Sequence, residues 1–216
     1  MIQVKIQPIR RELDLAVASW LGPEARAGML VKTASEILAQ TDARNRNALE
    51  QDVPHRTVVD GTPSEALERV RADGVIVRTY DVMPILLMEI GRLLWIHSPV
   101  KTGAYQQSHR LLADGNEIAA VTDGWSLSSV PAGVGEFVFA PSVSYARPLE
   151  GGWSKQAPDG IYQVVAVMVK ATFGHFAKIA FGYREIAGLT ETKVEQQARP
   201  YSPRDLRQPV IIIQPS

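Results

Sequence analysis

The sequence contains no cysteine among its 216 residues. This absence excludes a disulfide framework, a thiol nucleophile and a zinc site built on cysteine ligands. It is compatible with the cytosol, where thiols stay reduced.

An excess of charge of one sign is also lacking. The 23 Lys and Arg residues equal the 23 Asp and Glu residues, so the formal net charge is zero. A protein that grips nucleic acid through phosphates normally carries a basic excess or a basic face. We therefore expect any contact with DNA to be loose and independent of base sequence.

Long apolar runs are absent as well. The most apolar stretch, residues 82–96, is interrupted by Glu89, Gly91 and Arg92, and a membrane span needs about 20 apolar residues. The N-terminus lacks the apolar segment of a secretory signal. We expect a buried helix at 82–96 and no membrane partner.

The first third of the chain shows clear periodicities. Apolar and polar residues alternate over 2–6, which predicts a strand. Apolar residues recur at helical spacing over 8–21 and again from Pro23 to Glu50. Two β-branched runs, 56–59 and 75–80, indicate strands on either side of a short helical turn.

The second half changes character after Ser98. Short apolar runs at 111–112, 118–121 and 137–139 are separated by Asp-Gly pairs, the usual signal for antiparallel hairpins. A helix is predicted at 161–176 and a last core strand at 179–183. No internal repeat is evident. Turn geometry alone accounts for the five Asp-Gly pairs, which begin at Asp60, Asp73, Asp114, Asp123 and Asp159.

These patterns predict an α+β fold, with N-terminal helices and a core helix packed on an antiparallel β-sheet and an extended C-terminal arm. One domain is expected over 1–185, with a strand and helices in 1–53 and the core sheet and helices in 54–185. The arm covers 186–216. Its apolar end docks either on the chain's own fold or on a neighbouring subunit, and the sequence leaves both open.

A search for catalytic groups finds little. His55, His97, His109 and His175 have no carboxylate or histidine at ligand spacing. Neighbours on a strand point to opposite faces, so Ser108 and His109 are not expected to form a nucleophile–base pair. We expect these histidines at the surface or at helix ends.

Glu150 and Asp159 flank a loop that contains Trp153, an arrangement that a sugar site could use. A turn-rich loop with an exposed aromatic residue at an interface is the favoured interpretation. Residues 101–103 lack the order of a phosphate loop, and 41–52 lack the spacing of a calcium loop. The sequence therefore predicts no enzyme, no cofactor and no metal, but a protein that acts by assembly.

Two segments carry a more specific pattern. Residues 98–108 and 145–151 resemble the two signatures of a family of small tail-completion or neck proteins of long-tailed bacteriophages. The resemblance rests on these positions: Ser98, Pro99, Lys101, Thr102, Gly103, Ala104, Tyr105 and Ser108, then Tyr145, Ala146, Glu150 and Gly151. Pro99 is expected to stop a helix and Gly103 to turn the chain. Tyr145 is expected to bury its ring. Glu150 is expected to pair with a basic group across the fold or the subunit boundary, with Lys101 and Arg147 as candidates.

The resemblance implies a structural virion protein that is assembled in the host cytoplasm and forms a ring, hexameric by preference, in the phage neck. Its expected partners are further copies of itself, head-side connector or head-closure proteins, and tail terminator or tail-tube proteins. Genomic DNA would pass through the lumen. The alternatives are a tail terminator or head-closure protein of the same machine, a tail-associated cell-wall hydrolase and a nucleic-acid-binding module. Candidate subunit contacts are Trp153, Arg199, Arg204, Arg207, Val210, Ile211, Ile212 and Ile213.

Overall fold

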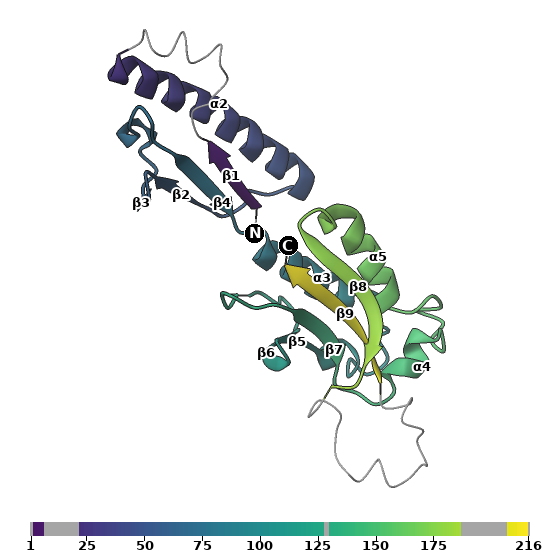
Figure 1. Cartoon of the computed structure of the whole chain (residues 1–216). Coiled ribbons are helices and arrows are strands. Elements are labelled where there is room, and N and C mark those ends of the chain that lie inside the picture. Colours follow the sequence, from purple (N-terminus) through teal and green to yellow (C-terminus); the bar gives the residue numbers. More distant parts are fainter. Residues whose placement is uncertain (1, 7–21, 128–129, 187–206, 216) are drawn as a thin grey trace. The chain divides into compact units, whose positions relative to one another are not determined.

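The computed structural model describes residues 2–6, 22–127, 130–186 and 207–215 (Figure 1). It has the expected α+β composition of helices and antiparallel sheets, but it divides into two compact units, Met1–Val82 and Met83–Ser216. The predicted single domain over 1–185 is therefore replaced by two units. The reason is that each unit has its own sheet and its own covering helix. The helix predicted at 8–21 lies outside the described residues.

Unit 1 is a four-stranded sheet covered on one face by a long helix (Figure 1). The strands lie in the order β1-β4-β2-β3, all antiparallel. Their bounds are β1 Ile2–Ile6, β2 His55–Val59, β3 Thr62–Pro63 and β4 Ile76–Tyr80. The helix α2 spans Pro23–Leu49, and the short turn η1 spans Leu67–Arg69.

The sequence explains why α2 begins and packs where it does. Pro23 fixes a helical φ at a position whose N–H has no intrahelical partner, and Glu24 lies favourably at the positive end of the helix dipole. Leu30, Ala34 and Leu38 recur every four residues, so they line one face, and they are buried in a cluster with Val59, Val70 and Ile76 of the sheet side.

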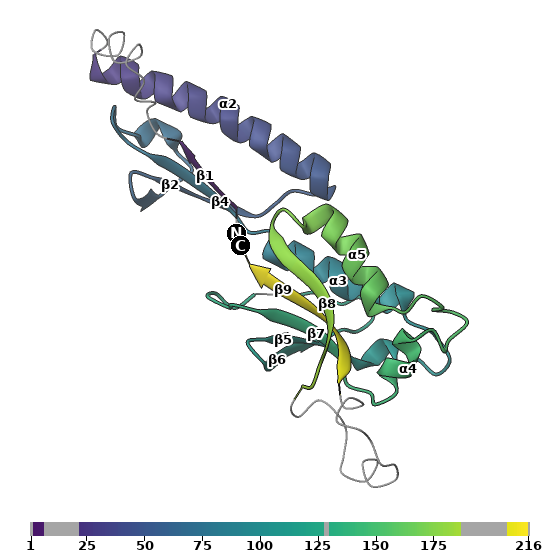
Figure 2. The same ribbon diagram turned by 45° about the vertical axis from the view of Figure 1, so that its right-hand side comes forward.

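Unit 2 is a five-stranded antiparallel sheet in the order β6-β5-β7-β9-β8, with α3 and α5 on one side of it (Figures 1 and 2). The strands are β5 His109–Ala113, β6 Asn116–Ala120, β7 Phe137–Pro141, β8 Ala177–Arg184 and β9 Gln208–Pro215. The helices are α3 Met83–His97, α4 Ala146–Glu150 and α5 Tyr162–Phe173, with the turn η2 at Gln106–Ser108. The buried helix predicted at 82–96 is confirmed as α3.

The apolar end of the predicted arm is a central strand of this sheet. Strand β9 pairs with β7 on one side and with β8 on the other. Val210, Ile211 and Ile213 are fully buried, so they are core residues of their own subunit, and their prediction as partner contacts is wrong. Ile212 beside them is half-buried, and its contact with a partner stays a prediction. The reason for the burial is that β9 lies between two strands and its apolar side chains pack with those of its own sheet. Val210 and Ile212 pack with Leu112 and Val138 on one face, and the register places Ile211 and Ile213 opposite the phenylalanines of β7 on the other.

Candidate functional site

The two segments that resemble the phage family lie together in unit 2. We call this region the α3–α5 joint, defined as residues 98–109, which connect α3 to β5, and residues 145–163, which run from α4 into α5. The structure shows how each signature residue is held.

Residues 98–108 connect the end of α3 to the start of β5. Ser98 ends α3 by donating its hydroxyl to the carbonyl of Leu94 at 2.6 Å, and Pro99 follows directly, so the predicted helix stop is confirmed. Gly103 has a φ of +78°, which confirms the predicted turn. Further on, Ser108 is buried and donates its hydroxyl to the carbonyl of Tyr105 at 2.7 Å.

Thr102 and Gly151 have minor local roles. The hydroxyl of Thr102 is exposed and accepts the amide of Ala104 at 3.4 Å. Gly151 closes α4, and its N–H donates to the carbonyl of Arg147 at 3.1 Å.

Glu150 caps the N-terminus of α5. One carboxylate oxygen accepts the backbone N–H groups of Ile161 and Tyr162, both at 3.0 Å, and the other accepts that of Gln163 at 2.8 Å. These donors belong to the first turn of a helix and have no intrahelical acceptor. The negative charge also lies at the positive end of the helix dipole. Glu150 is only 8% exposed. The partners of this carboxylate are backbone amides, so its predicted pairing with Lys101 or Arg147 is wrong.

The approach of Glu150 to α5 depends on a glycine. Gly160 has a φ of +83°, and a Cβ at this position would lie 2.7 Å from the Oε1 atom of Glu150. Any other residue would therefore strain the backbone and displace the carboxylate. This contact also assigns a structural reason to the Asp159-Gly160 pair beyond turn formation.

His109 is completely buried at the centre of the joint, so its predicted place at the surface or a helix end is wrong. Its Nε2 atom lies 2.7 Å from the Ser98 hydroxyl, and its Nδ1 atom lies 2.8 Å from the Tyr162 hydroxyl. Burial, and secondarily the charge of Arg110, lowers the pKa of His109 to about 3. The ring is therefore neutral near pH 7 and carries one proton.

The hydrogen-bond directions in this chain follow from its ends. Ser98 already donates to Leu94, so its oxygen must accept the proton of His109 Nε2–H. The unprotonated Nδ1 atom then accepts the hydroxyl proton of Tyr162. Each proton shared among Ser98, His109 and Tyr162 therefore has one acceptor, and these hydrogen bonds connect the end of α3 with β5 and α5.

The distances resemble those of a serine–histidine catalytic pair, but the chemistry differs. A nucleophilic serine must give its proton to the histidine, and here the serine proton points to a backbone carbonyl. Ser98 is also only 4% exposed, which leaves no room for a substrate carbonyl. We interpret this group as a structural hydrogen-bond chain.

Tyr145 is exposed, and a different tyrosine, Tyr105, is buried in the joint. Tyr145 is 44% exposed, so the predicted burial of its ring is wrong. Tyr105 is the buried one: its ring contacts His109 edge-on at 5.1 Å between centroids and meets the ring of Tyr145 at 6.3 Å. Burial raises the pKa of Tyr105 above its usual range. The exposed face of Tyr145 therefore marks where the joint reaches the surface.

Exposed apolar side chains occur in the joint and at the end of α3 beside it. Ile96 is 57% exposed, Val100 is 56% exposed and Trp153 is 81% exposed. The amide of Val100 donates to the Gln156 side chain at 2.7 Å, which fastens the segment after α3 to the loop that carries Trp153. The expected exposure of Trp153 is confirmed. Of the candidate arginines, Arg207 is exposed, and Arg199 and Arg204 lie outside the described residues.

Unit 1 holds a second polar cluster, between α2 and its sheet. The guanidinium of Arg78 donates to Thr57 at 2.9 Å, to Asp42 at 3.1 Å and to Glu65 at 3.0 Å. Tyr80 donates its hydroxyl to Asp42 at 2.6 Å, and burial is the main reason that the pKa of Tyr80 rises to about 12. All three guanidinium nitrogens are paired, as a buried charge requires, so the cluster joins the helix to the sheet.

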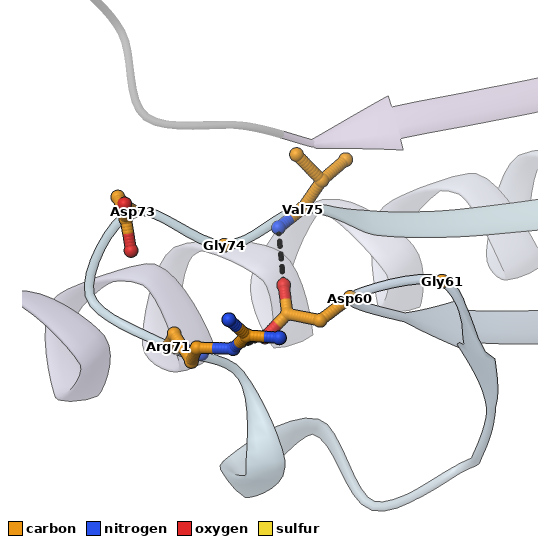
Figure 3. A pocket seen from close by; sticks show the side chains of 6 residues that line it. All are labelled: Asp60, Gly61, Arg71, Asp73, Gly74 and Val75. Carbon is orange, nitrogen blue, oxygen red and sulfur yellow. Dashed lines mark hydrogen bonds and ion pairs between the residues drawn. The ribbon is translucent and has the colours of Figure 1, made fainter.

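A surface hollow of about 350 Å³ lies beside Asp60 in unit 1 (Figure 3). The Asp60 carboxylate accepts the backbone amides of Arg71 at 2.9 Å and of Val75 at 2.8 Å. These hydrogen bonds, the one from Arg71 above all, lower the pKa of Asp60. The Asp60 carboxylate is therefore engaged by its own loop, and Asp73 is the other acidic residue that lines the hollow. Across the described ranges, no group of three His, Cys, Asp or Glu residues could hold a metal ion.

Comparison with known proteins adds no relative: no family model, no curated protein and no solved structure matches the chain. In the part of the chain that the structure describes, no helix combines the length and apolar character that crossing a membrane requires.

Proposed function

We propose that this chain is a structural subunit of the neck of a long-tailed bacteriophage, where copies of it form a ring that joins the head connector to the tail and lets DNA pass. Six copies are preferred, because the tails of such phages have six-fold symmetry. Tail terminator and head-closure proteins of the same machine are the neighbouring assignments.

The observation that carries the proposal is the α3–α5 joint. The resemblance rests on residues from two separate segments, 98–108 and 145–151, and these segments are fastened to each other through His109, Glu150 and Gln156. Several polar groups of the joint, among them Ser98, His109 and Glu150, are buried and bonded to helix ends or to one another. The exposed side chains of the joint include Lys101 and Lys155 as well as apolar ones, of which Trp153 is the most exposed.

An arrangement of this kind suits binding to another protein surface. Exposed tryptophan side chains held on a rigid base are frequent anchors of protein interfaces, because a large area is buried at little cost in conformational entropy. The zero net charge suits a conduit for DNA, since a strongly basic lumen would retain the phosphates. We expect the ring to be held by packing and not by ionic contacts.

The test compares assembly of the wild type with Trp153→Ala and with Lys155→Ala as the matched control. Both positions are exposed in the same loop, so neither change disturbs the core. Sedimentation velocity should show a ring for the wild type and for the control, and dissociation to smaller species for Trp153→Ala at the same concentration. Equal assembly of all three proteins would show that Trp153 does not contribute to the interface. A monomeric wild type would refute the ring.

A further inference from the structure

Two stretches of the sequence, one in each unit, are variants of one pattern. Residues 55–61 read HRTVVDG and residues 109–115 read HRLLADG, with His, Arg, Asp and Gly at the same four of seven positions. Each stretch forms the first strand of a hairpin and its turn, β2 to β3 and β5 to β6. The sequence analysis found no internal repeat, and the structure reveals this one.

The two hairpin turns have the same backbone geometry. Asp60 and Asp114 have φ values of +50° and +45°, and the glycines that follow have +81° and +84°. A positive φ at both residues is the geometry of a two-residue hairpin turn, for which Asp-Gly is a preferred sequence.

The two aspartates also make the same hydrogen bonds. Asp60 donates its amide to the carbonyl of Val75 at 2.9 Å, and its carboxylate accepts the Val75 amide at 2.8 Å. Asp114 donates its amide to the carbonyl of Glu136, and its carboxylate accepts the Glu136 amide at 3.0 Å. Val75 and Glu136 each directly precede a third strand, β4 or β7.

The first and third strands of each unit are paired in the same register. His55 pairs with Tyr80 and His109 with Pro141, and in each unit five consecutive pairs join the first strand to the third. A fourth strand then lies antiparallel on the far side of the third, β1 in unit 1 and β9 in unit 2. In both units an α-helix, α2 or α3, comes before the first strand of the hairpin. The fourth strand differs in chain order, because β1 precedes α2 whereas β9 follows β8. The units therefore share a helix, a hairpin and a third strand, to which each adds a fourth strand from a different place in the sequence; we call this shared arrangement a module.

The modules differ at the outer edge of the fourth strand. In unit 2 this edge of β9 is paired along its whole length with the eight residues of β8. In unit 1 no strand within the described ranges pairs with the equivalent edge of β1. An unpaired edge presents backbone donors and acceptors that a further strand can complete.

We propose that the outer edge of β1 in one copy of the chain binds the outer edge of β8 in a neighbouring copy. The inference rests on the proposed ring. Joining two different edges is a head-to-tail contact, which can be repeated from copy to copy until a ring closes. A contact between two β1 edges would stop at a dimer.

The other free edges in the described part of the chain are poorer partners. Strand β3 has two residues, one of them Pro63, which has no N–H to donate. Strand β6 has five residues beside an irregularity in its pairing at Leu111/Leu112, and such bulges turn an edge away from further strands. Strand β8 has eight residues without proline, which gives it the longest uninterrupted edge.

Cysteine cross-linking tests the contact in the full-length chain, which has no cysteine of its own. Lys5→Cys on β1 is combined with Ala180→Cys on β8, and the matched control combines Lys5→Cys with Ile118→Cys on β6. Paired strands lie about 4.8 Å apart, so a short bismaleimide bridges them. The first double variant should give a ladder of covalent oligomers on a denaturing gel, and the control and each single variant should stay monomeric.

The outcomes separate this inference from the proposed function. A ladder from the β6 control, or dimers from Lys5→Cys alone, would overturn the β1–β8 contact. Absence of cross-links in a protein that light scattering shows as a ring would overturn it as well, while leaving the neck function in place. A protein that is monomeric by light scattering would refute both.

Discussion

Replacing Glu150 by glutamine perturbs the joint at its best-defined contact. The carboxylate accepts three amides of α5 and is only 8% exposed. Glutamine keeps one acceptor oxygen and brings an NH₂ group, which has nothing to donate to where three N–H groups converge. A hydrogen bond to a charged group contributes about 1.5–3 kcal/mol, and an N-cap about 1 kcal/mol. Because the three bonds share one group, we expect a loss of about 3 kcal/mol in the free energy of unfolding of unit 2.

Urea denaturation followed by circular dichroism measures this loss. The control is Glu117→Gln, which removes an exposed ion pair with Arg110 and should cost less than about 1 kcal/mol. Glu150→Asp retains the charge but shortens the side chain, so it should fall between the two. If Glu150→Gln were within about 0.5 kcal/mol of the wild type, the capping role would be wrong, and a role of Glu150 across a subunit boundary would become the better explanation.

Three further predictions concern buried or strained positions. The pKa of His109 is lowered to about 3 from 6.5, so between these pH values the unfolded chain binds a proton that the folded chain does not. The free energy of unfolding should therefore fall by about 1.4 kcal/mol per pH unit as the pH decreases through this range. The variant His109→Gln, unfolded in urea at several pH values, should lack this dependence on pH. Gly91→Ala places a Cβ against the indole of Trp125, which donates to the carbonyl of Met88 at 3.0 Å; we expect a loss of about 1–3 kcal/mol, and an unchanged melting temperature would contradict the contact. Asp60→Asn should cost about 1–2 kcal/mol at pH 7, and because the folded pKa of Asp60 is lowered, the difference from the wild type should shrink as the pH falls below 3.8; a constant difference would argue against the charged form as the acceptor.

The sequence predicted most elements of the fold because their signals are local. The alternation over 2–6, the proline at the start of α2 and the apolar length of α3 each depend on neighbouring residues alone. The Asp114-Gly115 pair likewise predicted the hairpin between β5 and β6. The division into two units was missed because it depends on which strands pair, and pairing is not local.

The joint was predicted only in part, for the same reason. His109 was expected at the surface because its partners, Ser98 and Tyr162, lie 11 and 53 residues away. Residues 210–213 were expected as the apolar end of an extended arm and not as a strand, because the strand they form depends on pairing with β7 and β8, which lie far away in the sequence. The repeat has a signal in HRTVVDG and HRLLADG, but Asp-Gly turns occur in unrelated hairpins, so the matching strand register is needed to recognise it.

The most direct test of the central claim is the mass of the purified full-length protein in solution, measured by light scattering and paired with negative-stain images. The account predicts closed rings whose mass is a multiple of 23.7 kDa, with six copies preferred. A single species of 23.7 kDa without rings, at concentrations where phage structural proteins assemble, would contradict it.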